Sequence, residues 1–341
     1  MNMSEGNETA CPICGERVVP VSKPFEGYVE GYVTTVLECV GCRARLSSRN
    51  DVPTWLYDRI YDQAEVIPGY GRYHRYEAAA SKHPAPLDFL AEAEDPYWHV
   101  REHLRAQSGT AGLRVVELGC GAGYLTYALR QAGIDCLGVD ISAKAIARAQ
   151  ARYGHPEWFQ TLEEFNAESG AVDLVVALEL IEHVPDPVSL VRQALSMLVA
   201  GGALLLTTPD RDACRPGEVW ASDAPPVHLF WLGRQALQVV ADNCAAAIDF
   251  PRPRPLSSSG PVPPVNECWP PVLTAAGDVT PLVSRSVGLA ARLRLHASAL
   301  LRRLSAAAAP PRTRTIEPVV AGAPRPGATL AAVLRRPATG D

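Results

Sequence analysis

Apolar residues recur with two different spacings along the 341-residue chain. Between residues 112 and 250, apolar runs of strand length alternate with segments whose apolar residues recur at helical spacing. This alternation is typical of βαβ units, in which helices cover both faces of a parallel sheet. The pattern predicts strands over residues 114–120, 136–142, 158–161, 172–181, 202–209 and 245–250, and helices over residues 124–132, 143–153, 162–168, 187–198 and 233–244. The expected fold class is therefore α/β, with a doubly wound, Rossmann-like sheet.

The segments on either side of this region follow other patterns. Residues 51–107 are rich in tyrosine and tryptophan, which predicts a helical connector whose aromatic side chains pack on the next domain or line a ligand cleft. Residues 251–271 contain eight prolines and are expected to form a loop. Leucines at roughly helical spacing over residues 280–304 predict an amphipathic basic helix, and residues 329–334 predict a last short strand. The expected organisation is an N-terminal unit over residues 1–50, a connector over 51–107, an α/β core over 108–250, a Pro/Arg-rich insertion over 251–327, and a final strand and tail over 328–341.

Four of the nine cysteines form two Cys-x-x-Cys pairs, Cys11 with Cys14 and Cys39 with Cys42, which are separated by 24 residues. The residues between the pairs predict short strands, so each pair would lie on a tight turn at a hairpin end. Four thiolates at this spacing suit tetrahedral Zn²⁺, and a unit of about 40 residues lacks a core large enough to fold without such a link. We therefore expect a small zinc ribbon with a structural metal, because four cysteines leave no open coordination position. Iron or a metal-free ribbon are the alternatives.

Composition and charge exclude several classes of protein. A hydrophobic share of 47% with 20% charged residues is typical of a globular chain. The net charge of −5 argues against a general nucleic-acid binder. The N-terminal residues resemble no export signal and no apolar run reaches the roughly 18 residues of a membrane span, so a cytoplasmic location is expected. Residues 279–316 hold seven arginines and no Asp or Glu, which suits an anionic acceptor, a solvated helix or weak contact with an acidic membrane surface.

A glycine-rich turn carries the clearest chemical signal. Gly119, Gly121 and Gly123 follow a buried strand and precede a helix, where the backbone can approach a ligand closely. Their spacing differs from that of dinucleotide-binding turns, which argues against an NAD-dependent oxidoreductase. Glu117 lies at the end of the same strand, and Asp140 ends the next one, where a carboxylate can accept both hydroxyls of a ribose. Together these residues predict a site for a nucleoside without a pyrophosphate.

The run from Glu117 to Gly123, with Asp140, resembles the class I S-adenosylmethionine-dependent methyltransferases. Residues 172–187 and 201–209 extend the resemblance as a fourth strand with its following turn and as a fifth strand. The resemblance implies strand order 3-2-1-4-5-7-6 with strand seven antiparallel, the three glycines around the methionine moiety, Glu117 on its amino group and Asp140 on the ribose. The cofactor-binding residues expected from it are Glu117, Gly119, Gly121, Gly123, Asp140, Ile141, Thr161, Leu162, Leu178 and Glu179.

A zinc ribbon ahead of such a domain resembles a subgroup of bacterial methyltransferases that act on sugars. This resemblance implies a small-molecule acceptor, most simply a sugar or nucleotide-linked sugar in glycan or secondary-metabolite biosynthesis. A quinone-like or aromatic acceptor is the alternative. A non-catalytic S-adenosylmethionine-binding or scaffold protein is the rival from another class, and it would be favoured if the purified protein failed to bind the cofactor.

Two histidines are the candidates for removing a proton from the acceptor. Glu179, Glu182 and His183 are spaced i, i+3, i+4, which on one helical turn would bring them to one side. A similar run in ubiquinone-pathway O-methyltransferases implies a divalent ion; alternatively the two glutamates only orient His183. His228 precedes a helix at a position where the resemblance implies a histidine near the acceptor. We expect His183, His228 and Glu182 to form the catalytic group, with either histidine as the base.

Overall fold

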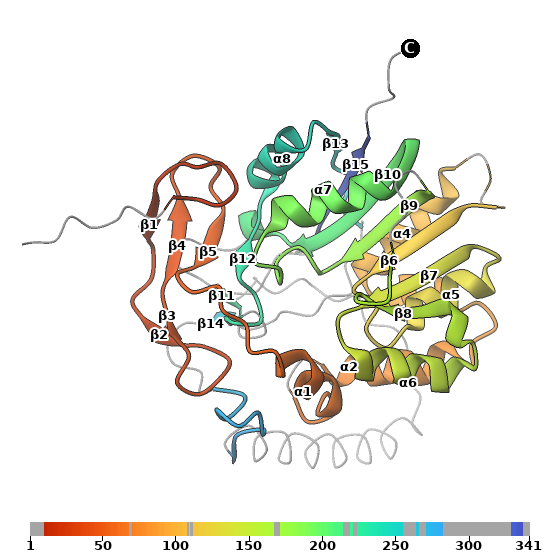
Figure 1. Cartoon of the computed structure of the whole chain (residues 1–341), viewed down its shortest axis with the longest axis horizontal. Coiled ribbons are helices and arrows are strands. Elements are labelled where there is room, and N and C mark those ends of the chain that lie inside the picture. The colour runs from red at the N-terminus through yellow and green to blue at the C-terminus, as the bar shows by residue number, and fades with distance from the viewer. Residues whose placement is uncertain are drawn as a thin grey trace, which may run out of the picture.

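The computed structural model describes residues 10–67, 70–107, 109, 112–166, 171–213, 219–220, 224–254, 264–265, 271–281 and 329–336. Its centre is a seven-stranded sheet with the order β13-β15-β10-β9-β6-β7-β8 (Figure 1). The strands are β6 (Arg114–Leu118), β7 (Asp135–Asp140), β8 (Phe159–Thr161), β9 (Val172–Leu178), β10 (Leu198–Pro209), β13 (Ala247–Asp249) and β15 (Thr329–Arg335). Only β15 runs antiparallel to its neighbours, β10 and β13. The expected order 3-2-1-4-5-7-6 is confirmed.

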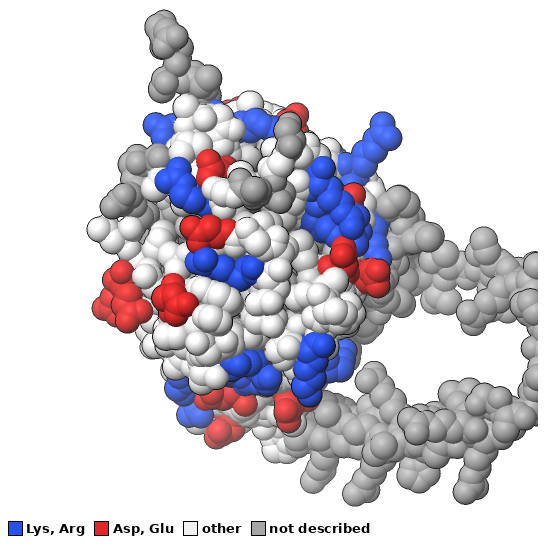
Figure 2. Space-filling model, turned by 90° about the vertical axis from the view of Figure 1, so that its right-hand side faces the viewer, with Lys and Arg blue, Asp and Glu red and all other residues white. Residues whose placement is uncertain are grey.

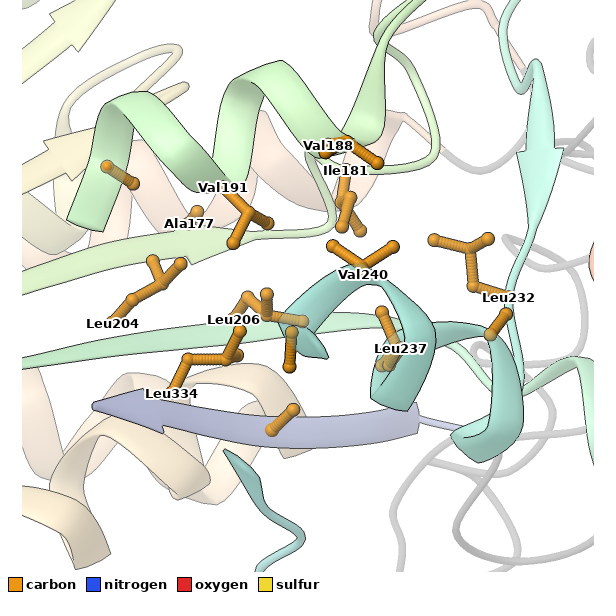
Figure 3. Packing of buried hydrophobic residues seen from close by; sticks show 14 of the residues in the cluster. Ala177, Ile181, Val188, Val191, Leu204, Leu206, Leu232, Leu237, Val240 and Leu334 are labelled. Carbon is orange, nitrogen blue, oxygen red and sulfur yellow. The ribbon is translucent and has the colours of Figure 1, made fainter. Parts of the chain in front are cut away.

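Helices cover both faces of this sheet because successive residues of each strand point to opposite sides. On one face, Leu204 and Leu206 of β10 pack with α7 (Pro187–Met197) and α8 (Arg234–Asn243), as Figure 3 shows. On the other face, Leu205 packs with α3 (Pro86–Ala93), α4 (Asp95–Arg105) and α5 (Tyr124–Gln131). Helix α6 (Ala143–Tyr153) packs beside β8. The sheet is therefore a buried central layer, and its carboxyl edge carries the loops between the elements.

Local side chains fix where several of these helices begin. Ser142 Oγ accepts a hydrogen bond from the Ala145 amide at 3.1 Å and caps α6, and Asp186 Oδ1 accepts one from the Ser189 amide at 2.9 Å at the start of α7. The helix expected over residues 162–168 is wrong: residues 162–164 form a turn and residues 165–166 have no regular structure. Thr161 and Glu164 close that turn by bonding to each other's backbone amides, and Leu162 is exposed rather than part of an apolar face.

The N-terminal unit forms a second sheet with the order β1-β4-β5-β12. Strands β1 (Val18–Pro20), β4 (Val36–Cys39) and β5 (Arg45–Ser47) come from this unit, whereas β12 (Phe230–Trp231) comes from the segment that precedes α8. A hairpin of β2 (Phe25–Glu26) and β3 (Val33–Thr34) extends from it. The ribbon therefore continues into the α/β core through a shared sheet (Figure 1).

The connector and the insertion complete the molecule. Helices α1 (Leu56–Asp62) and α2 (Gly71–Ala80) lead from the ribbon to α3, and α1 lies beside the carboxyl edge of the sheet (Figure 1). Short elements are η1 (Pro156–Trp158), η2 (Arg211–Ala213), and the pair β11 (Val219–Trp220) with β14 (Pro264–Val265). Residues 282–328, with most of the expected basic helix, lie outside the described residues.

The insertion between β13 and β15 leaves from the carboxyl edge of the sheet, because β13 runs parallel to β10.

Basic and acidic side chains are interspersed on the face shown in Figure 2. In the described part of the chain, we find no helix with the length and apolarity that crossing a membrane requires.

Candidate functional site

The glycine turn after β6 has the backbone that a closely bound ligand requires. The backbone φ angles of Gly119, Gly121 and Gly123 are 74°, 51° and 73°. Residues other than glycine rarely adopt this left-handed conformation. A Cβ atom on Gly123 would lie 2.5 Å from the Phe159 ring, so a larger residue does not fit there. The turn therefore keeps its open backbone at the start of α5, as expected for a cofactor-binding turn.

Asp140 links the two strand ends that form this site. Its Oδ2 accepts a hydrogen bond from the Gly121 amide and its Oδ1 accepts one from the Ser142 amide, both at 2.8 Å. The side chain is buried, and burial raises the pKa of its carboxyl. A carboxylate oxygen can accept more than one hydrogen bond, so both oxygens retain the capacity to accept a ribose hydroxyl.

Glu117 is the buried acid of the turn. The Thr126 hydroxyl donates a short hydrogen bond to its Oε2. Burial raises the pKa of Glu117 to about 8, and the bond from Thr126 only partly offsets this. An approaching ammonium group would favour the ionised form, so this carboxyl has the chemistry expected of an anchor for the amino group of the cofactor.

Three of the expected cofactor-binding residues, Ile141, Thr161 and Leu162, lie together at the ends of β7 and β8. A cavity of about 330 Å³ is lined by Ile141, Ala143, Thr161, Leu162 and Glu163. Ile141 and Leu162 are 72% and 53% exposed, and both are large apolar side chains. An exposed apolar pair at the mouth of a cavity suits a planar ring between them.

Helix α1 contributes three residues to this edge: Tyr57 and Tyr61, which belong to the aromatic segment expected to pack on the next domain or line a ligand cleft, and Asp58, which the sequence pattern did not indicate. The Ser142 hydroxyl donates to Asp58 Oδ1 at 2.6 Å. The Tyr61 hydroxyl lies 3.2 Å from the position of a Cβ on Gly121. The Tyr57 hydroxyl lies 3.3 Å from His183 Nδ1. Helix α1 therefore touches the glycine turn, the end of β7 and the turn after β9, and covers the site.

Glu182, His183 and His228 form a tight group, with ligand atoms within 4.8 Å of one another. The histidine ring centroids are 4.5 Å apart, and His183 Nε2 lies 3.9 Å from Glu182 Oε1. His183 Nδ1 is 2.7 Å from the Val227 carbonyl, a contact that favours the tautomer with the proton on Nδ1 and a lone pair on Nε2. Burial lowers the pKa of both histidines to about 3. Both rings are therefore neutral near pH 7, and each neutral ring has one nitrogen lone pair that can face a ligand.

Glu179 does not join this group among the described residues. The expected helical turn is wrong because Glu179 has a φ angle of 49°, and its amide donates to the Thr207 carbonyl at 3.0 Å. Leu178, the last residue of β9, is half-buried beside it. Of the three residues expected on one helical turn, the structure brings together Glu182 and His183. His228 joins them from a distant segment of the chain.

The turn after β9 packs against the glycine turn. Leu180 lies 3.1 Å from the position of a Cβ on Gly119, and the His183 amide donates to the Leu180 carbonyl at 3.0 Å. The negative charges of Glu182 and Asp140 both act on the pKa of Tyr57, which places this ring near the two sites. The histidine group is therefore adjacent to the proposed cofactor site.

Tyrosines from α2, α4 and α5 form an aromatic wall on the same edge. Tyr73 stacks on Tyr124 with ring centroids 6.4 Å apart and an interplanar angle of 15°. Tyr76 and Tyr97 meet Tyr124 edge to face, and the Tyr97 and Tyr124 hydroxyls are 2.6 Å apart. Burial raises the pKa of Tyr73, and the nearby charges of Glu94 and Glu179 add to this. The wall thus joins α2 and α4 to the start of α5.

The four ribbon cysteines fit a zinc ion. Their sulfur atoms lie within 4.8 Å of one another, with 3.7 Å between Cys11 and Cys42 and 3.3 Å between Cys14 and Cys39. A tetrahedron with Zn–S bonds of about 2.3 Å has edges of roughly 3.8 Å, close to the first of these distances. A hydrogen bond from Cys42 lowers the pKa of Cys11, which favours a thiolate in the group. The donor set suits a structural site.

Comparisons with known proteins agree with this geometry. A family model described as a methyltransferase domain matches residues 74–244. A ubiquinone biosynthesis O-methyltransferase of Methylococcus capsulatus is 33% identical over 116 residues, 32% of this chain and 49% of that protein. Its counterpart in Aromatoleum aromaticum is 35% identical over 153 residues, 38% of this chain and 64% of that protein. The chain spans about half the length of the first of these relatives.

A solved S-adenosylmethionine-dependent methyltransferase of Mesorhizobium loti is 19% identical. The alignment covers 72% of this chain and all of that one, with a TM-score of 0.41.

Proposed function

This chain belongs to the methyltransferase domain family, and from that membership we propose that it transfers a methyl group from S-adenosylmethionine to a hydroxyl of a small aromatic acceptor. When bound, the cofactor supplies a methyl group activated by a sulfonium charge. Asp140 would hold the ribose, Glu117 the amino group, and Ile141 and Leu162 the adenine. The observation that carries the proposal is the position of the Glu182–His183–His228 group beside the glycine turn.

Two features support an aromatic acceptor over the sugar that the ribbon resemblance implies. The similar ubiquinone biosynthesis enzymes are named as O-methyltransferases. The aromatic wall around Tyr73 and Tyr124 consists of apolar rings, a kind of surface that suits a planar acceptor better than a sugar. A phenol also loses its proton more readily than a sugar hydroxyl, so it requires a weaker base. A quinol-like or catechol-like acceptor is therefore our proposal, and a nucleotide-linked sugar is the competing one.

His183 and His228 have one of two roles toward the acceptor hydroxyl. In the first, the Val227 carbonyl holds the His183 ring so that its Nε2 lone pair takes the hydroxyl proton. In the second, the buried carboxylate and two neutral imidazoles hold a divalent cation, a donor set that suits such an ion. A bound cation would lower the pKa of a hydroxyl at this position. Burial favours the neutral form of both imidazoles, and either role requires that form.

An assay with two acceptors tests the proposal. Purified protein is incubated with S-adenosylmethionine labelled on its methyl group and with either 3,4-dihydroxybenzoate or UDP-glucose. We expect label in the catechol and a mass gain of one methylene, and none in the nucleotide sugar. Methylation of UDP-glucose alone would favour the sugar reading. Activity that requires added Mg²⁺ or Mn²⁺ would identify the histidines as cation ligands, and activity unchanged after chelation would identify a base.

A further inference from the structure

The ribbon sheet ends beside the candidate catalytic histidines. Strand β12 begins two residues after His228 and pairs antiparallel with β5, with Phe230 opposite Leu46 and Trp231 opposite Arg45. The Ser47 amide also donates to the Leu229 carbonyl at 2.9 Å. The segment that carries His228 is therefore one edge of the ribbon's own sheet.

The opposite side of this segment holds the turn that carries the other two members of the group. The amides of Leu229 and Phe230 donate to the Glu182 carbonyl at 2.8 and 3.1 Å. The Val227 carbonyl accepts the hydrogen bond from His183 Nδ1 at 2.7 Å. Residues 227–230 thus lie between the ribbon and the turn, and any shift of β12 moves His228 and changes the bond that sets the tautomer of His183.

A buried ionic cluster connects the ribbon to the residues that follow β10. Glu38 of β4 pairs with Arg45 at 3.0 Å and with Arg211 at 2.6 Å, and Arg43 joins from the surface at 3.0 Å. The Arg211 amide donates to the Leu232 carbonyl at 3.1 Å, directly after β12. The cluster therefore ties β4, β5 and the end of β12 together.

The two cysteine turns dock on α8 through one amide side chain each. Asn243 Nδ2 donates to the Ile13 carbonyl at 2.6 Å, and Gln235 Nε2 donates to the Gly41 carbonyl at 2.8 Å. The cysteine sulfurs themselves belong to the same buried cluster as Leu229 and Leu237. The metal site is therefore continuous with the core that supports β12.

We propose that the metal-loaded ribbon is a positioning element of the active site, which holds His228 and the His183 tautomer through β5 and β12. The catalytic role of the histidines rests on the proposed function, but their placement by the ribbon does not. A ribbon that only stabilised the fold would act on cofactor binding and turnover alike. A positioning element acts on the histidines while the cofactor residues, which lie on β6 and β7, keep their geometry.

The variant Glu38→Gln tests this without touching a cysteine or a histidine. Glu30→Gln is the matched control, because Glu30 is an exposed acid of the same ribbon. Four quantities are measured on the full chain: zinc content, S-adenosylmethionine affinity by calorimetry, ring ¹⁵N signals of labelled histidines, and turnover with 3,4-dihydroxybenzoate. We expect Glu38→Gln to keep zinc and cofactor affinity, to shift the His183 and His228 signals, and to lower turnover by about tenfold to a hundredfold. The control should match the wild type in all four.

Histidine signals that stay unchanged in Glu38→Gln would overturn the proposal, as would a parallel loss of cofactor affinity. If Glu38→Gln does not fold, Gln235→Ala removes a single exposed contact to the second cysteine turn and takes its place. Zinc removal and re-addition should reproduce the same histidine shifts reversibly. Absence of turnover in every protein would defeat the proposed function, whereas the histidine signals would still decide the positioning role.

Discussion

Replacing Glu117 with Gln should change how cofactor binding depends on pH. Glu117 is only 6% exposed, and burial raises the pKa of its carboxyl to about 8. Glutamine has nearly the same shape and can still accept the hydrogen bond from Thr126, so the variant removes the titratable charge with little change in packing. If the ionised carboxylate anchors the amino group of S-adenosylmethionine, binding requires Glu117 to lose its proton.

The expected magnitude follows from this linkage. Each pH unit below the pKa costs about 1.4 kcal/mol, or about tenfold in affinity, so binding to the wild type should weaken about 50-fold relative to Glu117→Gln from pH 8 to pH 6. The amino group of the cofactor, with a pKa of about 7.7–8.0, titrates equally for both proteins. Loss of a charge-assisted hydrogen bond should weaken binding to the variant by about 1.5–3 kcal/mol at pH 8, roughly 10- to 150-fold.

Calorimetry in two buffers with different ionisation enthalpies gives the number of protons released. The wild type should release close to one proton per cofactor at pH 6.5, and Glu117→Gln should release none from this site. The pH dependence of the melting temperature provides an independent test of the raised pKa of Glu117. A carboxyl whose folded pKa is raised stabilises the fold below its unfolded pKa, and that contribution is lost as pH rises through about 8. The cofactor-free variant should therefore melt higher than the wild type at pH 8 and above. Equal proton release by both proteins would refute the anchoring role.

Three further predictions concern the other parts of the site. Asp140→Ala should weaken S-adenosylmethionine binding at least about tenfold by calorimetry, since it removes charge-assisted bonds to the ribose; an unchanged dissociation constant would place the cofactor elsewhere. His183→Ala and His228→Ala, tested separately in single-turnover assays, should each slow methyl transfer, by about 10²- to 10⁴-fold for the base, at unchanged cofactor affinity; full activity in both would eliminate histidine catalysis. Elemental analysis should find one zinc per chain, lost in Cys11→Ser with a lower melting temperature but retained in Cys244→Ser; metal-free wild type with an unaltered Cys11→Ser would contradict the zinc site.

The sequence was sufficient for the sheet and the cysteine site because both leave local patterns. The central residues of strands β6, β9 and β10 are buried and mainly apolar, and the Cys-x-x-Cys pairs have the spacing of tight turns. The family resemblance then supplied the strand order. The helix expected over residues 162–168 was wrong because Thr161 and Glu164 mimic the capping pattern of a helix start but close only one turn.

Two features of the site depend on contacts between segments far apart in the chain. Strand β12 has only two residues, too few to show periodicity, so its pairing with β5 was not predicted. The spacing of Glu179, Glu182 and His183 suggested one helical turn, but the left-handed conformation of Glu179 breaks that turn. His228 takes the place expected for Glu179 in the cluster. It directly precedes β12, and the pairing of β12 holds it beside the turn after β9.

The binding of S-adenosylmethionine tests the account most directly, because the roles proposed for Glu117, Asp140 and the histidine group all depend on it. Calorimetric titration of the purified full chain should give one site per chain, and S-adenosylhomocysteine, which shares the ribose, adenine and amino group, should displace the cofactor competitively. Heats indistinguishable from dilution for both compounds, with a folded and zinc-loaded protein, would contradict the proposed methyltransferase and favour a scaffold.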